Sequence, residues 1–205
     1  MPVSITLLLI AATCVVSLIA FRNPRLIGRL ILWPPAIDRH RQYDRLLTYG
    51  FLHANFWHLL FNMVTLFFFG RYIEQLMTRL TGSGLTYLGF YLAALVVSVL
   101  PTYLKHQKDP NYTCLGASGA VSAVLFAFVL LNPWARILVF VIPMPAIVFA
   151  VLYVGYSIWM DRRGGDNVNH GAHLAGAAFG MLFMVAMEPD ILGHFLRELS
   201  QPRWG

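Results

Sequence analysis

The chain has 205 residues, of which 58% are hydrophobic and 12% are charged, and its formal net charge at pH 7 is +6. A water-soluble domain of this length could not bury so much apolar side chain, so lipid must be part of its solvent. Two cysteines are too few for a disulfide framework, and the basic residues form no stripe of the kind that binds nucleic acid. We therefore expect contacts with anionic lipid headgroups and no nucleic-acid partner.

Six apolar segments are each long enough to cross roughly 30 Å of hydrocarbon. We predict an all-α membrane protein, a six-transmembrane-helix bundle formed by residues 1–205 as a single domain. The first segment lacks a basic leading region and a good cleavage site, so we interpret it as a span rather than a signal peptide. The six spans are expected at about 3–21, 56–79, 85–104, 115–131, 137–160 and 168–187.

The connections between the spans are short except for the first, residues 22–55. This connection mixes arginines with apolar residues, which predicts short amphipathic pieces that lie in the membrane interface. Pro143 and Pro145 interrupt the fifth span, and we expect this helix to be the one that bends.

The second span carries polar side chains at both of its ends. His58 and Asn62 are four residues apart and therefore share one face of the helix, and His53 precedes them at the helix entry. Polar groups within a membrane are costly, so each of them requires a reason. Near the opposite end we expect Arg71 and Glu74 to form an interfacial ion pair.

The fourth and sixth spans also begin with polar residues. Ser118 lies early in the fourth span, and His170 and His173 lie one turn apart at the start of the sixth. With six spans, the even-numbered ones all start from the same side of the membrane. Ser118 and His173 are therefore expected at a similar shallow depth, together with His58 and Asn62.

The fourth and sixth spans carry small residues that let helix backbones approach closely. Gly176 and Gly180 make a GxxxG spacing in the sixth span. Close packing of the two spans would bring Ser118 next to His173, and a serine beside a histidine base is the minimal nucleophile pair. The small residues of the fourth span are Gly119, Ser122, Ala123 and Ala127.

Spacing alone leaves three interpretations of these polar residues open. They could be interhelical hydrogen-bonding groups, each worth around 1 kcal/mol. His170 and His173, with His58 or His53, could instead bind zinc or a transported ion, although no carboxylate or thiolate lies at matching depth and there is no HExxH motif. A hydrolase explains more of the pattern, because it gives the serine, the base and the extra donors each a role.

Taken together, these motifs resemble those of the rhomboid family of intramembrane serine proteases. The long first connection and the six expected spans agree with that family, so the resemblance covers nearly the whole chain. The matching stretches are "HANFWHLLFN" at 53–62, "GRYIE" at 70–74, "GASG" at 116–119 and "AHLAGAAFG" at 172–180.

The resemblance implies a Ser–His dyad without an aspartate. Ser118 would attack the scissile carbonyl to form an acyl-enzyme, while His173 accepts the proton and returns it to the leaving amine. His58 and Asn62 would stabilise the oxyanion together with the backbone N–H of Ser118. Such donors are worth roughly 2.7–4 kcal/mol each when they are aimed at developing charge. No metal or other cofactor is expected.

The resemblance also implies supporting roles around the dyad. Gly116 and Gly119 would let the backbone turn tightly and the substrate approach without a Cβ in the way. Close helix packing is the expected role of Gly176 and Gly180, and structural hydrogen bonding is the expected role of His53 and His170.

The chain departs from the family pattern at two places. Many members have Trp-Arg in the first connection, where this chain has Asp44 and Arg45. Many members also carry an aromatic residue four positions after the serine, which stacks on the histidine, and here that position is Ser122. Either another residue supports the imidazole of His173, or His173 is held more loosely, which would affect the rate more than the mechanism.

The membrane orientation is predicted differently by charge and by the resemblance. The positive-inside rule would place the side with more basic residues, which is also the side of Ser118, in the cytoplasm. The resemblance implies the extracytoplasmic side of a bacterial inner membrane. We follow the resemblance, because arginines embedded in an interfacial hairpin differ from free loop charges. Ten of the 15 lysines and arginines lie on this side: Arg22, Arg25, Arg29, Arg39, Arg41, Arg45, Lys105, Lys108, Arg162 and Arg163.

The function expected from these features is cleavage of transmembrane or membrane-adjacent segments of other proteins by an integral, multi-pass membrane endopeptidase. Its partners would be transmembrane protein substrates and membrane lipid, and the sequence carries no signal for the oligomeric state. The main alternative is a proteolytically inactive rhomboid-like protein that binds client transmembrane helices. A metal-site transporter is a more distant one.

Overall fold

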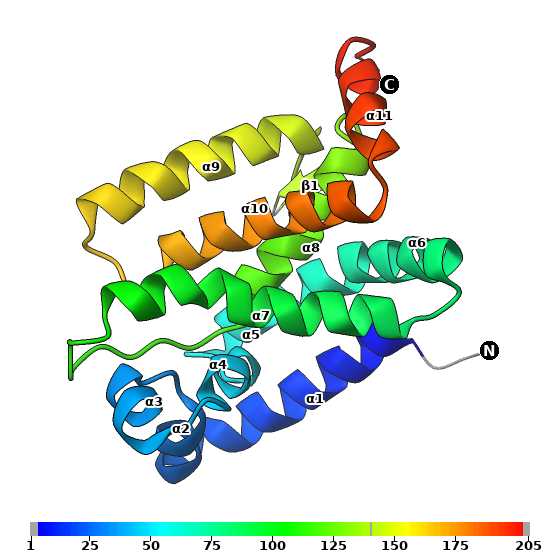
Figure 1. Ribbon diagram of the computed structural model, residues 1–205. Coiled ribbons are helices and arrows are strands. Elements are labelled where there is room, and N and C mark those ends of the chain that lie inside the picture. Colours follow the sequence, from blue (N-terminus) through cyan, green and yellow to red (C-terminus); the bar gives the residue numbers. More distant parts are fainter. Residues whose placement is uncertain (1–3, 140, 203–205) are drawn as a thin grey trace.

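The computed structural model describes residues 4–139 and 141–202, and most of these residues are helical (Figure 1). The first half of the chain forms α1 (Ile5–Ala20), α2 (Pro24–Leu30), α3 (Pro34–His40), α4 (Arg45–Thr48), the 3-10 helix η1 (Tyr49–Phe51), α5 (Phe56–Thr65), the π-helix η2 (Leu66–Gly70), α6 (Arg71–Thr81) and α7 (Leu85–Lys105). The second half forms α8 (Ser118–Leu131), β1 (Arg136–Val139), β2 (Ile142–Pro145), α9 (Ala146–Arg163), α10 (His170–Met187) and α11 (Asp190–Leu199).

Each of the six predicted apolar segments contains a helix, but the fifth becomes helical only at Ala146. Before that residue, β1 and β2 pair as an antiparallel hairpin in which Pro143 lies opposite Leu138. The prediction of a helical span over 137–160 was therefore wrong over 137–145. The physical reason is proline, since Pro143 and Pro145 lack a backbone N–H and obstruct a helix but are tolerated at the edge of a two-stranded sheet.

Among the residues that the structure describes, two helices are long and apolar enough to cross a membrane, namely α7 and α10. A third candidate span joins Arg45–Phe51 to Phe56–Thr81, with a bend of 98° between the two parts. α1 and α8 are apolar but shorter, with 16 and 14 residues. The described part of the chain is thus mostly helical with two or three candidate spans, and the count of six remains a prediction.

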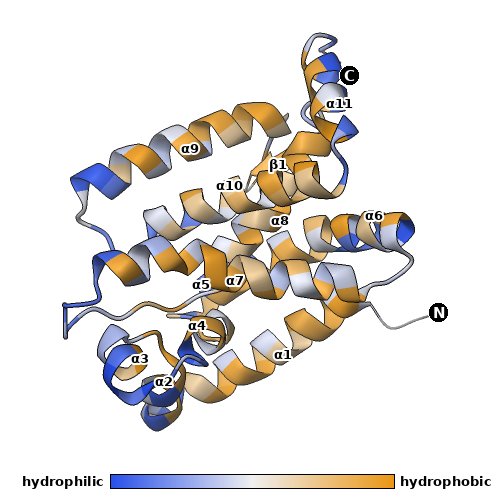
Figure 2. Cartoon of the chain, in the orientation of Figure 1, coloured by the Kyte–Doolittle hydropathy of each residue, from blue (hydrophilic) through white to orange (hydrophobic). Residues whose placement is uncertain are grey.

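The connection between α1 and α5 contains the short pieces α2, α3, α4 and η1, as its mixed composition predicted. Hydrophilic residues gather on α2 and α3 and at the ends of α7 and α9 that lie toward the same side of the molecule (Figure 2). α1, α8 and α10 are predominantly apolar along their length, whereas α6 and α11 also carry hydrophilic residues.

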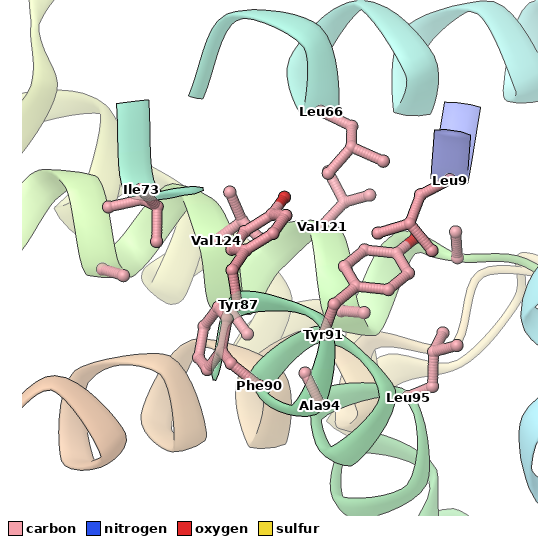
Figure 3. Close-up of a cluster of buried hydrophobic side chains, with 14 of the residues drawn as sticks. Leu9, Leu66, Ile73, Tyr87, Phe90, Tyr91, Ala94, Leu95, Val121 and Val124 are labelled. Carbon is pink, nitrogen blue, oxygen red and sulfur yellow. The ribbon is translucent and has the colours of Figure 1, made fainter. Parts of the chain in front are cut away.

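α8 forms the centre of the structure, with α7, α10 and η2 packed around it (Figure 1). Eleven of its 14 residues are buried. Val121 and Val124 of α8 belong to the same buried cluster as Tyr87 and Tyr91 of α7 and Leu66 of η2 (Figure 3). A helix that is buried on all sides has no polar face, which agrees with the nearly uniform apolar sequence after Ser118.

α10 packs so closely on α8 that their backbones touch. A Cβ atom at Gly176 would overlap the carbonyl oxygen of Gly119, and one at Gly180 would overlap that of Ala123. The two glycines of the GxxxG spacing therefore let α10 lie directly against α8, which is the general role of small residues between membrane helices.

Glu74 does not pair with Arg71, so the ion pair expected from their spacing was wrong. The Glu74 carboxylate instead accepts hydrogen bonds from Ser4 Oγ at 2.6 Å and from the backbone N–H groups of Ile5 and Thr6 at 2.7 and 3.0 Å. These backbone groups lie at the start of α1, where a helix has unpaired donors and favours negative charge. Arg71 lies over the Phe67 ring, 5.4 Å from its centroid. Glu74 thus connects the second predicted span to the first.

The contact between α10 and α8 can be tested by adding one methyl group. We expect Gly180→Ala to lower the thermal unfolding midpoint in detergent, because the new Cβ would force the two helices apart. Gly89→Ala is the matched control, since Gly89 also lies in a helix but has no atom within 4 Å of its would-be Cβ. There the change should be neutral or stabilising, because alanine favours helix more than glycine does. Equal effects of the two substitutions would contradict the close contact at Gly180.

Candidate active site

Ser118 and His173 lie at the junction of α8 and α10. Ser118 is the first residue of α8, and His173 lies one turn into α10. His173 Nε2 and Ser118 Oγ are 2.8 Å apart, and both residues are half-buried. This is the distance at which a histidine base can take the proton of a serine nucleophile.

Asn169 holds the start of α10 in place. Its Oδ1 accepts from the backbone N–H of Ala172 at 2.9 Å and from Thr102 Oγ1 of α7 at 2.9 Å. Its Nδ2 donates to Cys114 Sγ at 3.4 Å, four residues before Ser118. Sequence reasoning did not single out Asn169, although an asparagine just before a helix is a recognisable N-cap.

His58 on α5 faces the loop that leads into Ser118. Gly116 in this loop has a φ of +123°, and a Cβ atom there would lie 2.8 Å from His58 Cε1 and 3.1 Å from its Nε2. Glycine is therefore required at 116 both by the backbone conformation and by the ring. The Ala54 backbone N–H points at His58 Nδ1 at 3.5 Å, which assigns the ring proton to Nε2 on the side of Gly116.

Asn62 lies one turn after His58 and is buried. Its Nδ2 donates to the backbone carbonyl of His58 at 2.9 Å, so one of its two amide hydrogens is used within α5. The second hydrogen can donate elsewhere. The structure thus places His58 beside the loop that carries Ser118, whereas the Asn62 amide is turned toward its own helix.

His53 lies between Ser17 of α1 and His58, and it contacts both residues. Ser17 Oγ donates to the Phe51 carbonyl at 2.8 Å and therefore accepts from His53 Nδ1, 3.0 Å away. The rings of His53 and His58 meet edge to face, with centroids 4.8 Å apart. His53 thereby joins α1 to the histidine nearest Gly116.

His170 is buried and pairs with a carboxylate that His173 does not contact. Its Nε2 is 3.1 Å from Asp166 Oδ2, and its ring meets that of His173 edge to face, with centroids 5.8 Å apart. The hydrogen bond from His170 holds the pKa of the Asp166 carboxyl below its usual value. Asp166 therefore supports a neighbour of His173 and not His173 itself.

Gly119 lies against α7 at the start of α8. A Cβ atom there would overlap Ser98 Oγ of α7. The absence of a side chain at 119 therefore lets α7 pack against the start of α8. The role in substrate approach that the resemblance implies for Gly119 remains a prediction.

At the first departure from the family pattern, Asp44 and Arg45, the arginine has a structural role. Arg45 is buried, and its Nη1 donates to the carbonyls of Gly28 at 3.0 Å and Ile31 at 2.6 Å. Asp44 forms an exposed ion pair with Arg29 at 2.7 Å. Arg45 therefore holds the end of α2 against α4.

The second departure, at Ser122, is accompanied by a tyrosine from another helix. Ser122 Oγ and Tyr153 Oη are 2.6 Å apart, and the Tyr153 ring stacks on that of His173 with centroids 5.9 Å apart. Sequence reasoning left open what supports the His173 imidazole. Tyr153 was missed because it lies 31 positions from Ser122, on α9, and no local spacing connects the two residues.

The zinc interpretation required at least three ligating side chains to converge. Within residues 4–139 and 141–202, no group of three or more histidine, cysteine, aspartate or glutamate side chains is arranged to hold a metal ion.

Comparison with known proteins finds similarity to rhomboid proteins over much of the chain. A family model described as the Rhomboid domain matches residues 40–189. RHOMBOID-like protein 12, mitochondrial, of Arabidopsis thaliana is 34% identical over 147 residues, which cover 65% of this chain and 43% of that protein. Rhomboid-related protein 1 of Caenorhabditis elegans is 30% identical over 169 residues, covering 76% of this chain and 43% of that protein.

A bacterial relative is closer in length. The putative rhomboid protease YdcA of Bacillus subtilis is 24% identical over 159 residues, covering 75% of this chain and 74% of that protein. This chain therefore spans less than half the length of the Arabidopsis and Caenorhabditis proteins and about three quarters of the Bacillus protein.

Proposed function

The chain belongs to the rhomboid family, and on that premise we propose that it is an intramembrane serine endopeptidase. The observation that carries the proposal is the 2.8 Å distance between Ser118 Oγ and His173 Nε2. A hydrogen bond that only joined α8 to α10 could lie anywhere along the two helices. Here the serine is the first residue of α8, next to the loop with Gly116 and to His58.

Ser118 Oγ would attack the scissile carbonyl while its proton passes to His173 Nε2. The protonated His173 would then give this proton to the leaving amine, and a water molecule activated in the same way would release the acyl group from Ser118. With no carboxylate within hydrogen-bond distance of His173 among the described residues, the chemistry would rest on two side chains.

The negative charge on the carbonyl oxygen would be met by donors from α8 and α5. The backbone N–H of Ser118 is the first of its helix, where N–H groups have no acceptor within the helix and the helix dipole favours an anion. His58 Nε2–H lies on the side of Gly116, next to that loop. The Asn62 amide would be the third donor, through the hydrogen that is not bonded to the His58 carbonyl.

We propose that residues 1–205 act as one rhomboid-like membrane domain with six membrane-crossing segments. Its substrates would be transmembrane or membrane-adjacent segments of other proteins, and its lipid contacts would include anionic headgroups beside the basic residues of α2, α3 and the end of α9 (Figure 2). We place the protein in a bacterial inner membrane with Ser118 toward the extracytoplasmic side, as the resemblance implies. The name of the Arabidopsis relative includes the word mitochondrial, so a mitochondrial membrane is the alternative location.

The nucleophile is tested by labelling purified protein in mild detergent with a fluorophosphonate probe, which reacts with activated serines. We expect the wild type to label and both Ser118→Ala and His173→Ala to lose labelling, because one lacks the nucleophile and the other its base. Ser200→Ala, which removes a serine after α11, should label like the wild type. Failure of folded wild type to label, with a known rhomboid protease labelling alongside, would favour the inactive helix-binding alternative.

The oxyanion donors are tested by the cleavage rate of a transmembrane reporter in proteoliposomes. We expect His58→Ala and Asn62→Ala each to lower kcat by about 10²–10³-fold, the usual cost of removing one oxyanion donor. Asn132→Ala is a control for losing an amide elsewhere, because Asn132 lies at the opposite end of α8. A kcat for Asn62→Ala within a few-fold of wild type would assign Asn62 a purely structural role, consistent with its bond to the His58 carbonyl.

A further inference from the structure

Among the described residues, the imidazole of His173 has a hydrogen-bond partner at Nε2 but none at Nδ1. The partner of Nε2 is Ser118 Oγ. In a Ser–His–Asp triad an aspartate at this second nitrogen fixes the orientation of the ring. Here Asp166 pairs with His170 instead. The orientation of His173 must therefore come from the groups that pack on its ring.

Two contacts hold the Tyr153 side chain: its ring stacks on His173, and its hydroxyl lies beside Ser122. The plane of the Tyr153 ring lies 21° from that of the His173 ring with centroids 5.9 Å apart, an arrangement in the range of stacked aromatic pairs. Its hydroxyl lies 2.6 Å from Ser122 Oγ, and Ser122 is only 4% exposed. Ser122 lies one turn after Ser118 on α8, so the nucleophile and the anchor of the tyrosine belong to the same rigid segment.

Serine at 122 and tyrosine at 153 are complementary in size. Family members with an aromatic residue four positions after the serine carry the stacking ring on the helix of the nucleophile. This chain has the small Ser122 there, and the ring reaches the histidine from α9. The stacking group is thus retained, and only the helix that supplies it is different.

We propose that Tyr153 is a positioning residue for His173, with Ser122 as its anchor, a role that rests on the proposed function of the dyad. The ring limits rotation of the imidazole so that Nε2 stays directed at Ser118 Oγ. The hydrogen bond to Ser122 keeps the ring in register with α8. Loss of this alignment would slow proton transfer, since small misplacements of reacting groups cost large factors in rate.

A purely structural bond between α8 and α9 would explain the hydroxyl contact but not the stacking. Phe126 of α8 also packs against Tyr153, at a centroid distance of 5.6 Å, and Phe149 packs against it from within α9 at 5.5 Å. If Tyr153 is only structural, replacing it should lower the stability of the protein. If Tyr153 positions His173, replacing it should lower the reactivity of Ser118 in protein that remains folded.

The test measures the second-order rate of fluorophosphonate labelling of Ser118, together with the thermal unfolding midpoint, in one detergent. Tyr153→Leu removes the ring and should slow labelling about tenfold or more. Tyr153→Phe and Ser122→Ala keep the ring but remove its hydrogen bond, so each should slow labelling by a few-fold, less than Tyr153→Leu does. The double variant Tyr153→Phe with Ser122→Ala should be no slower than the slower single variant, because both changes remove the same hydrogen bond.

The deciding variant exchanges the two residues, Ser122→Tyr with Tyr153→Ser. It returns the ring to the position where the family often has it, and we expect it to recover most of the labelling rate that Tyr153→Leu loses. Trp159→Leu is the control on the same helix, since Trp159 is exposed and its ring contacts Arg163 and Tyr156 rather than His173. It should label at the wild-type rate.

Two results would overturn the positioning role and leave the proposed protease intact, provided that wild type labels and Ser118→Ala does not. One is a wild-type labelling rate in Tyr153→Leu. The other is a loss of rate in Tyr153→Leu that only parallels a lower unfolding midpoint and that neither Tyr153→Phe nor the exchange repairs. A wild type that does not label would overturn the protease proposal and the positioning role together.

Discussion

The backbone contact between α8 and α10 is the constraint on which the rest of the site depends. Gly119, against which Gly176 packs, is the residue after Ser118, and Gly176 lies three residues after His173. One of the two backbone contacts between these helices is therefore within one turn of the nucleophile and the base. With Gly180 against Ala123 one turn further on, α10 has little freedom to slide or rotate, so helix packing itself fixes the Ser–His distance.

The connection between α1 and α5 is tied to the loop before Ser118 by backbone hydrogen bonds. Leu32 and Cys114 exchange two such bonds at 3.0 and 3.1 Å, and Gly116 N donates to the Tyr49 carbonyl at 3.0 Å. Tyr49 itself is buried, and its hydroxyl donates to the Leu95 carbonyl of α7. The long connection between α1 and α5 thus holds the loop that places Ser118 at the start of α8, and Arg45 in turn holds that connection together.

The sequence predicted those features that local spacing encodes and missed those that depend on distant partners. Helices, the GxxxG contact and the approach of Ser118 to His173 follow from periodicity and from small residues at fixed intervals. The hairpin at β1 and β2 required the two prolines to be interpreted as strand residues, although each was recognised as an interruption. The contacts of Glu74 and Tyr153 could not be assigned from spacing, because their partners lie on other helices. A carboxylate such as that of Glu74, or a ring such as that of Tyr153, could pair with several different neighbours.

The origin of the stacking ring has a consequence for how the proposed protease would respond to its surroundings. A ring carried on α8 would move with Ser118, whereas Tyr153 belongs to α9, only three of whose 18 residues are buried. Interhelical hydrogen bonds in membranes contribute only about 0.6 kcal/mol on average, so the Ser122 contact is a weak restraint on so exposed a helix. A displacement of α9 would withdraw the ring from His173 while leaving Ser118 and His173 on their rigid pair of helices. The orientation of the base, and not its distance from the nucleophile, is therefore the property that α9 would control.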